Sequence, residues 1–92
     1  MFTSAAASSA NCSQKNNTVG FMGVDGGDGK IYVAVSDHNG GCDTNSFRFK
    51  PDNADTDKIL SVLLTAKVAN MKVRIDVIDS TDQNSAYKVY LE

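Results

Sequence analysis

Two tyrosines and two arginines have the types and spacing from which a binding surface is built. The four residues that fall on the outward side of a predicted strand are Tyr32, Arg48, Arg74 and Tyr90. Tyrosine and arginine anchor ligands at sugar-binding and protein-binding surfaces, because each combines a flat face with hydrogen-bonding groups. Ordinary strand surface is the alternative, since tyrosine favours strands in any case. The sequence offers these four residues as a candidate ligand or partner surface.

No group of residues has the spacing of a catalytic or metal centre. His38 is the only histidine, and Asp37 is the only candidate partner beside it in sequence, which is typical of a solvated turn. Asp25 and Asp28 lie in a glycine-rich stretch, but glycines occupy the positions where a calcium loop needs oxygen ligands. We therefore expect a protein that is not an enzyme and that uses no metal and no cofactor.

The two cysteines, Cys12 and Cys42, are too far apart for a redox motif or a zinc knuckle. They are either reduced structural thiols or a disulfide. The disulfide is favoured because the N-terminal residues, described next, resemble a secretory leader. Closing a loop of about 30 residues would stabilise the fold by ~3–4 kcal/mol. That is a large share of the stability of a domain this small.

Residues 1–10 resemble the tail of a secretory leader. Ser8 and Ala10 fit the two small-residue positions before a leader-peptidase cleavage, which would leave Asn11 as the mature start. A flexible low-complexity tail is the alternative interpretation. We predict a residual signal-peptide-like tail at 1–10, one domain at 11–92, and a periplasmic or secreted bacterial protein.

Length and charge narrow the classes of partner. The 92 residues suffice for one domain, and 41% of them are apolar and 22% charged. The net charge is −2, with lysines and arginines scattered, which argues against a nucleic-acid partner or an anionic membrane surface. No segment is long and apolar enough to insert into a membrane.

The elements that position these residues show two kinds of hydrophobic periodicity, that of a β-strand and that of an α-helix. Apolar and polar residues alternate over five predicted strands, at 18–24, 30–36, 45–50, 72–79 and 86–92. Between the third and fourth, Ile59, Leu63 and Ala66 share one face of a helix predicted over 55–70, with Asp55 and Asn70 as its caps. The order β-β-β-α-β-β is that of an OB-type five-stranded Greek-key barrel, and it makes this a mainly β protein with one helix.

The segment 55–91 resembles the C-terminal half of the binding subunits of AB-type bacterial toxins, the cholera, pertussis and subtilase-cytotoxin class. It also resembles small exported bacterial proteins that share their barrel. The features that carry the resemblance are a helix ending L-T-A-K-V, a short link at Asn70 and Met71, a strand of alternating charge and a last strand at the C-terminus. The resemblance implies an OB barrel, assembly into a ring with helices lining the centre, and binding to cell-surface glycans. Cholera-type subunits stack a sugar on a tryptophan after the helix; that position falls at Arg74 here, and the cysteine pair is placed differently.

Two functions are consistent with these features. The first is an exported, oligomeric binding module that recognises a glycan or a cell-surface partner without catalysis. The second is an exported accessory or structural protein that assembles through its helix face or its sheet edges. The apolar face of the helix is wider than one small sheet needs, because Leu60, Val62 and Leu64 extend it, and this favours a homo-oligomer in either case.

Overall fold

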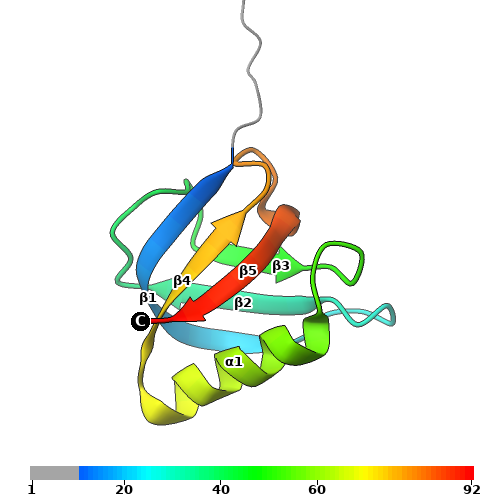
Figure 1. Cartoon of the computed structure of the whole chain (residues 1–92), viewed down its shortest axis with the longest axis horizontal. Coiled ribbons are helices and arrows are strands. Elements are labelled where there is room, and N and C mark those ends of the chain that lie inside the picture. Colours follow the sequence, from blue (N-terminus) through cyan, green and yellow to red (C-terminus); the bar gives the residue numbers. More distant parts are fainter. Residues whose placement is uncertain (1–10) are drawn as a thin grey trace, which may run out of the picture.

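The computed structural model describes residues 11–92, which form a mainly β structure with one α-helix (Figure 1). The elements in chain order are β1 (Cys12–Val24), β2 (Ile31–Ser36), β3 (Ser46–Phe49), α1 (Thr56–Ala69), β4 (Lys72–Val77), the 3-10 turn η1 (Gln83–Ser85) and β5 (Ala86–Leu91). The predicted order of three strands, a helix and two strands is confirmed. The leader-like tail expected at residues 1–10 lies outside the described residues.

The strands form a single closed sheet in the order β1-β2-β3-β5-β4, in which β4 returns to pair with β1. All neighbouring strands are antiparallel except β3 and β5, which run parallel and meet at Phe49 and Ala86. β1 is long because residues 12–18 pair with β4 while residues 18–24 pair with β2. The α1 helix lies beside one end of the sheet (Figure 1).

β1 begins at Cys12, whereas the alternation of the sequence predicts a start at Thr18. The reason is that two polar side chains, Gln14 and Asn17, are fully buried in its first half. Asn17 Nδ2 donates to the backbone oxygens of Gln14 (2.8 Å) and Val73 (2.9 Å), and Gln14 Nε2 donates to Asn17 Oδ1 (2.9 Å). Gln14 Oε1 is the one side-chain atom of this pair that has no hydrogen-bond partner among the described residues. Buried polar side chains of this kind break the apolar pattern from which a strand is predicted.

The core is filled by the inward residues of the strands and by one stripe of the helix. Ile59, Leu63 and Ala66 are the buried residues of α1, as their spacing predicts. Asp55 caps the helix by accepting from the Lys58 backbone N–H (3.3 Å), and Asn70 ends it in the left-handed region at φ 57°.

No helix among the described residues is long and apolar enough to cross a membrane.

The predicted disulfide between Cys12 and Cys42 is confirmed, with 5.6 Å between the two Cα atoms. It ties the start of β1 to the loop that joins β2 and β3. Gly41 is next to it, with φ +99°, and a Cβ at this position would run into the carbonyl oxygen of Ser13. The loop therefore lies directly on the β1 backbone at the disulfide.

Candidate functional site

The four predicted surface residues form two separate pairs. Tyr32 and Arg48 face each other across β2 and β3, and the guanidinium lies 4.9 Å from the centre of the tyrosine ring. Arg74 and Tyr90 face each other across β4 and β5 in the same way, at 5.4 Å. Both are cation–π contacts between facing residues of antiparallel strands. The two pairs differ in what surrounds them.

The Tyr32–Arg48 pair has a second aromatic ring beside it. Phe21 of β1 packs edge-on against Tyr32, with 5.9 Å between ring centres, although the Phe21 side chain is 76% exposed. The pairing of β1 with β2 shifts register between Val19 and Met22, which places Phe21 in an irregular stretch of the strand. A bulge of this kind re-aims a side chain, and here it accompanies an apolar ring that faces outward.

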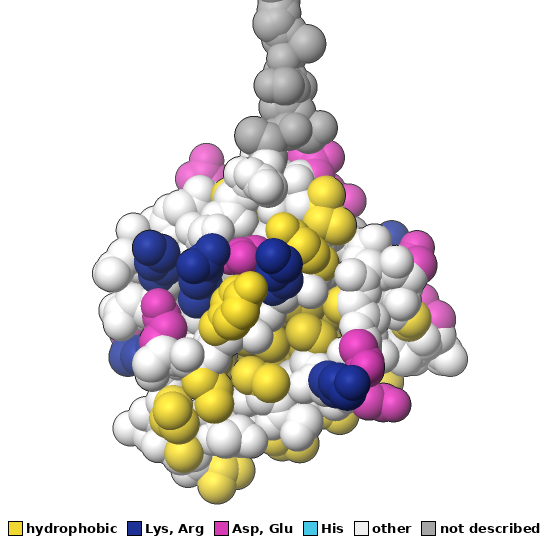
Figure 2. Space-filling view, viewed as in Figure 1, with side chains coloured by type: hydrophobic (Ala, Val, Ile, Leu, Met, Phe, Trp, Pro, Cys, Tyr) yellow, Lys and Arg dark blue, Asp and Glu magenta, His cyan; other side chains and the backbone are white. Residues whose placement is uncertain are grey.

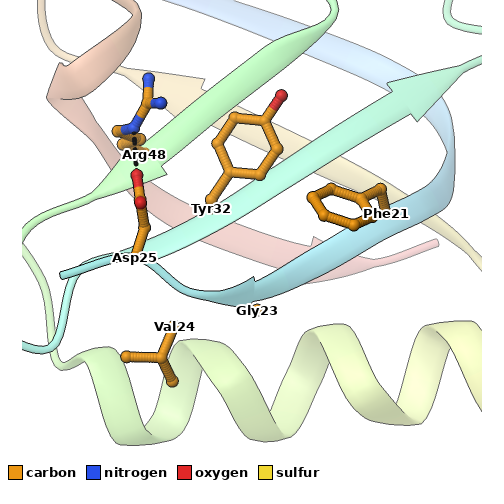
Figure 3. Close-up of a pocket in the computed structure, with 6 residues that line it drawn as sticks. All are labelled: Phe21, Gly23, Val24, Asp25, Tyr32 and Arg48. Carbon is orange, nitrogen blue, oxygen red and sulfur yellow. Dashed lines mark hydrogen bonds and ion pairs between the residues drawn. The ribbon is translucent and has the colours of Figure 1, made fainter.

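A hollow of about 350 Å³ lies against this aromatic pair (Figure 3). The residues that line it are Phe21, Gly23, Val24, Asp25, Tyr32 and Arg48. Gly23 faces Tyr32 across β1 and β2, and a Cβ at Gly23 would meet no atom within 4 Å. The lack of a side chain at Gly23 therefore leaves this part of the hollow open.

Arg48 is held at this hollow by two loops. Its Nε donates to Asp25 Oδ2 at 2.6 Å, and its Nη1 donates to Asn84 Oδ1 at 3.4 Å. Asp25 opens the β1–β2 turn and Asn84 lies in η1 of the β4–β5 connection. The guanidinium thus bridges the two loops that flank the outer face of β2 and β3.

The β1–β2 turn is closed by its own hydrogen bonds. The Asp25 N–H donates to the Lys30 carbonyl oxygen (2.6 Å), and Gly26 and Gly29 adopt positive φ of 104° and 83°. The hydrogen bond that Asp28 accepts from the Lys30 backbone, together with the Lys30 charge, lowers the pKa of Asp28. The sequence indicates a hairpin-type turn at Asp25-Gly-Gly-Asp-Gly, and the Asp28 carboxylate stabilises this turn, whereas the Asp25 carboxylate pairs with Arg48.

A second hollow of about 350 Å³ adjoins the first and shares Asp25 and Arg48 with it. Its other lining residues are Lys30, Lys50 and Asn84. Lys30 pairs with Asp28 at 3.4 Å, whereas no ion pair within residues 11–92 involves Lys50. The site therefore has an aromatic part and a cationic part, with the Asp25–Arg48 ion pair between them.

Arg74 of the other pair is bound into the sheet instead, whereas Tyr90 is 46% exposed and lines a separate hollow of about 320 Å³ between α1 and β5. Arg74 donates from Nε and Nη2 to the two carboxylate oxygens of Asp76 (2.9 and 3.2 Å) and from Nη2 to Ser13 Oγ (3.3 Å). Asp76 is only 5% exposed, although the alternation of β4 places it outward. Burial alone would raise the pKa of Asp76, but hydrogen bonds from Arg74 and Ser13 lower it below its ordinary value. Because Ser13 adjoins Cys12, this pair ties β4 to β1 beside the disulfide.

Hydrophobic side chains also gather outside the core. Figure 2 shows them over the lower left of the molecule, where α1 ends. Val68 and Leu64 of the helix are 85% and 47% exposed, and Leu91 at the end of β5 is exposed as well. An apolar surface of this kind is typical of an interaction site when it is continuous.

His38 and the acidic residues are the other side chains considered for catalysis or metal binding. His38 Nδ1 accepts from the Gly40 N–H (3.3 Å) within its own loop. Between residues 11 and 92 no group of three or more His, Cys, Asp and Glu side chains could hold a metal ion.

A comparison with protein-family models finds no match, and comparisons with curated proteins and with solved structures find no significant match. The site is therefore interpreted from its own geometry. Tyr32 and Arg48 were found from the sequence by strand alternation. Phe21, Asp25 and Asn84 are site residues that the sequence analysis does not identify. The one sequence signal for Phe21 is that glycines flank it at Gly20 and Gly23, where a bend or bulge is favoured.

Proposed function

We propose that this chain is an exported, non-catalytic binding module of OB type that holds a carbohydrate on the outer face of β2 and β3. The observation that carries the proposal is the open hollow in which Phe21 and Tyr32 stand beside the Asp25–Arg48 ion pair. The ligand could be a free glycan or one displayed on a cell surface. The proposal agrees with the function expected from the resemblance to toxin-binding subunits.

The strand order supports an OB-type Greek-key barrel. In that fold the sheet runs β1-β2-β3-β5-β4, and oligosaccharides or oligonucleotides bind on the strand 2–3 face between the β1–β2 and β4–β5 loops. The order of strands in this sheet is the same. Tyr32 and Arg48 lie on this face, and Arg48 contacts Asp25 in one flanking loop and Asn84 in the other.

The mixture of side chains favours a sugar. A pyranose ring has an apolar C–H face that packs on an aromatic ring and an edge of hydroxyls that both donate and accept hydrogen bonds. Phe21 and Tyr32 offer the aromatic surface, and the carboxylate of Asp25 with the guanidinium of Arg48 offers an acceptor and donors side by side. Ligand sites combine an apolar lining with a few fixed polar groups in this manner.

Export is supported by the disulfide, since disulfides persist in oxidising compartments such as the bacterial periplasm and the extracellular space. Assembly is supported by Val68 and Leu64, whose exposure on α1 suits burial against another subunit. This exposed helix face also favours the second candidate, an accessory or structural protein that assembles through it. The two candidate functions share a fold, and they differ in whether the hollow beside Phe21 and Tyr32 binds a ligand.

A glycan array probed with disulfide-intact protein tests the proposal. We expect binding to a defined set of glycans, and a loss of about tenfold or more in affinity when Phe21→Ala removes one aromatic face. Gly23→Val should weaken binding similarly, because valine suits a strand and its side chain would extend from a position where a Cβ meets no atom within 4 Å. Wild-type protein that binds no glycan, or variants that bind as well as wild type, would overturn the proposal. A solution mass measured by light scattering separates a ring or dimer from a monomer.

A further inference from the structure

We propose that the ligand of this site is an acidic carbohydrate, whose ring occupies the aromatic hollow and whose carboxylate or sulfate occupies the neighbouring hollow at Lys50 and Lys30. This inference rests on the proposed function and adds the chemical class of the sugar. The two hollows share Asp25 and Arg48, so one ligand can occupy both.

Lys50 supplies the positive charge that such a group would meet. Arg48 is neutralised by Asp25 at 2.6 Å, and Lys30 by Asp28 at 3.4 Å. Lys50 lines the same hollow and takes part in no ion pair of the described residues. The chain has a net charge of −2, but the unpaired lysine makes this concave site attractive to an anion.

The backbone sets the distance from the aromatic part to this charge. Lys50 follows β3 directly and is two residues beyond Arg48, so an extended backbone places the two side chains on the same face about 6–7 Å apart. Pro51 disfavours a helical backbone at Lys50 and so keeps it extended. This separation suits an acidic group on the sugar that stacks beside Tyr32, or on the next sugar along.

A sugar acid fits this site better than a nucleic acid does. Single strands are held by a groove in which basic residues follow many phosphates, with several rings for stacking. Here Asp25 and Asp28 stand among the cations, and the hollow offers one unpaired lysine. The carboxylates at the site can accept hydrogen bonds from sugar hydroxyls, which the phosphates of a single strand cannot donate.

The test compares acidic and neutral forms of the same sugar by calorimetry on the intact, disulfide-bonded protein. The probes are oligogalacturonate and its methyl ester, chondroitin sulfate oligosaccharides and their desulfated form, and an oligo-dT strand. The variants are Lys50→Gln and, as a control with the same change of charge, Lys15→Gln at an exposed position outside both hollows.

We expect at least one acidic form to bind at least about tenfold more tightly than its neutral partner, because a charge-assisted hydrogen bond is lost in the neutral form. Lys50→Gln should remove this preference and leave the neutral form unaffected, whereas Lys15→Gln should preserve the preference. Equal binding of acidic and neutral forms, or a preference that survives Lys50→Gln, would overturn the acidic class and leave the carbohydrate site standing. Binding of oligo-dT alone would overturn both proposals. If no probe binds, the acidic class is overturned, and the glycan array decides whether the hollow binds another carbohydrate.

Discussion

Arg48 above Tyr32 and Arg74 above Tyr90 are the same side chains at facing positions of antiparallel strands, yet their carboxylate partners lie in different places. Asp25, which pairs with Arg48, is in a turn and is partly exposed. Asp76, which pairs with Arg74, is buried and two residues away on the same strand. An arginine tied to a turn stands at the mouth of a hollow, whereas one tied to a buried carboxylate holds strands together.

The neighbours of each pair support this distinction. Phe21 is exposed beside Tyr32 and leaves an aromatic face open to a ligand. Ser13, beside Arg74, adjoins the disulfide and accepts the last hydrogen bond of the guanidinium. We infer that the Arg48 region is built for binding and the Arg74 region for stability. The following predictions test this distinction by changing a residue in one region and measuring the effect on stability or on binding.

Removal of the disulfide should have the largest effect, and it should fall on the Arg74 region. Replacing Cys12 and Cys42 together by alanine is expected to lower the free energy of unfolding by about 3–4 kcal/mol, because the unfolded chain is no longer constrained. Urea unfolding measures this loss. Hydrogen exchange should show that residues 12–18 lose protection before β2 and β3 do. A loss below about 1 kcal/mol would contradict the prediction, and reduction of the wild-type disulfide gives the same test if the variant fails to fold.

Gly41→Ala should have the next largest effect. Its φ of +99° strains any other residue, and the new Cβ would run into the Ser13 carbonyl oxygen. We expect a loss of about 2 kcal/mol or more in the free energy of unfolding. Gly27→Ala is the matched control, because a Cβ there meets nothing within 4 Å and the φ is not positive. Equal melting temperatures of the two variants would show that the loop does not press on β1 as described.

The stabilising parts of the molecule were largely predictable from the sequence. The caps Asp55 and Asn70 and the buried stripe of α1 follow from local rules and are confirmed. The disulfide, which the leader-like tail favours over two reduced thiols, is confirmed as well. The first half of β1 was not predictable, since Gln14 and Asn17 are buried through hydrogen bonds to one another and to Val73. Hydrophobic periodicity carries no information about a strand that buries amides.

The candidate site was predictable only in part. Alternation placed Tyr32 and Arg48 on the outer face, and the closed sheet makes them cross-strand neighbours. Asp25 and Asn84 are 59 positions apart in the sequence, and both contact Arg48 only because the β1–β2 and β4–β5 connections flank the same strands. Strand alternation likewise predicts a single surface that contains all four tyrosine and arginine residues. Only the pairing of the strands shows that they form two separate pairs.

Replacing each of the two carboxylates by an amide compares the two arginine pairs most directly. Asp76→Asn should lower the free energy of unfolding by about 1–2 kcal/mol, because Arg74 and Ser13 lose a charged partner, and should leave glycan binding unchanged. Asp25→Asn should do the reverse: it should cost about 0.5 kcal/mol or less in stability, as partly exposed ion pairs do, and change the affinity for the glycan, because the site loses a carboxylate and Arg48 loses its partner. Paired measurements of unfolding and affinity on both variants decide the matter. If both variants lose stability and keep binding, the Arg48 region is structural too.

The smallest effect we expect is the dependence of stability on acid. The pKa of Asp76 in the folded protein lies below its ordinary value of about 3.9, so protonation favours the unfolded chain. The stability that this carboxylate contributes is therefore fully present above about pH 5 and is lost as the pH falls through the folded pKa. In Asp76→Asn this loss should be absent, so the difference in stability between wild type and variant should shrink on acidification.

The control for this comparison is Asp28→Asn. The pKa of Asp28 is also lowered, by the Lys30 backbone hydrogen bond, but its carboxylate is exposed in the β1–β2 turn. Solvent weakens such a contribution, so the gap between wild type and Asp28→Asn should change little between pH 5 and pH 2. Urea unfolding at intervals over this range measures both gaps. A wild-type advantage over Asp76→Asn that stays constant or grows in acid would mean that the Asp76 charge does not hold β4 to β1, and the contrast between the two arginine pairs would then lie in their surroundings alone.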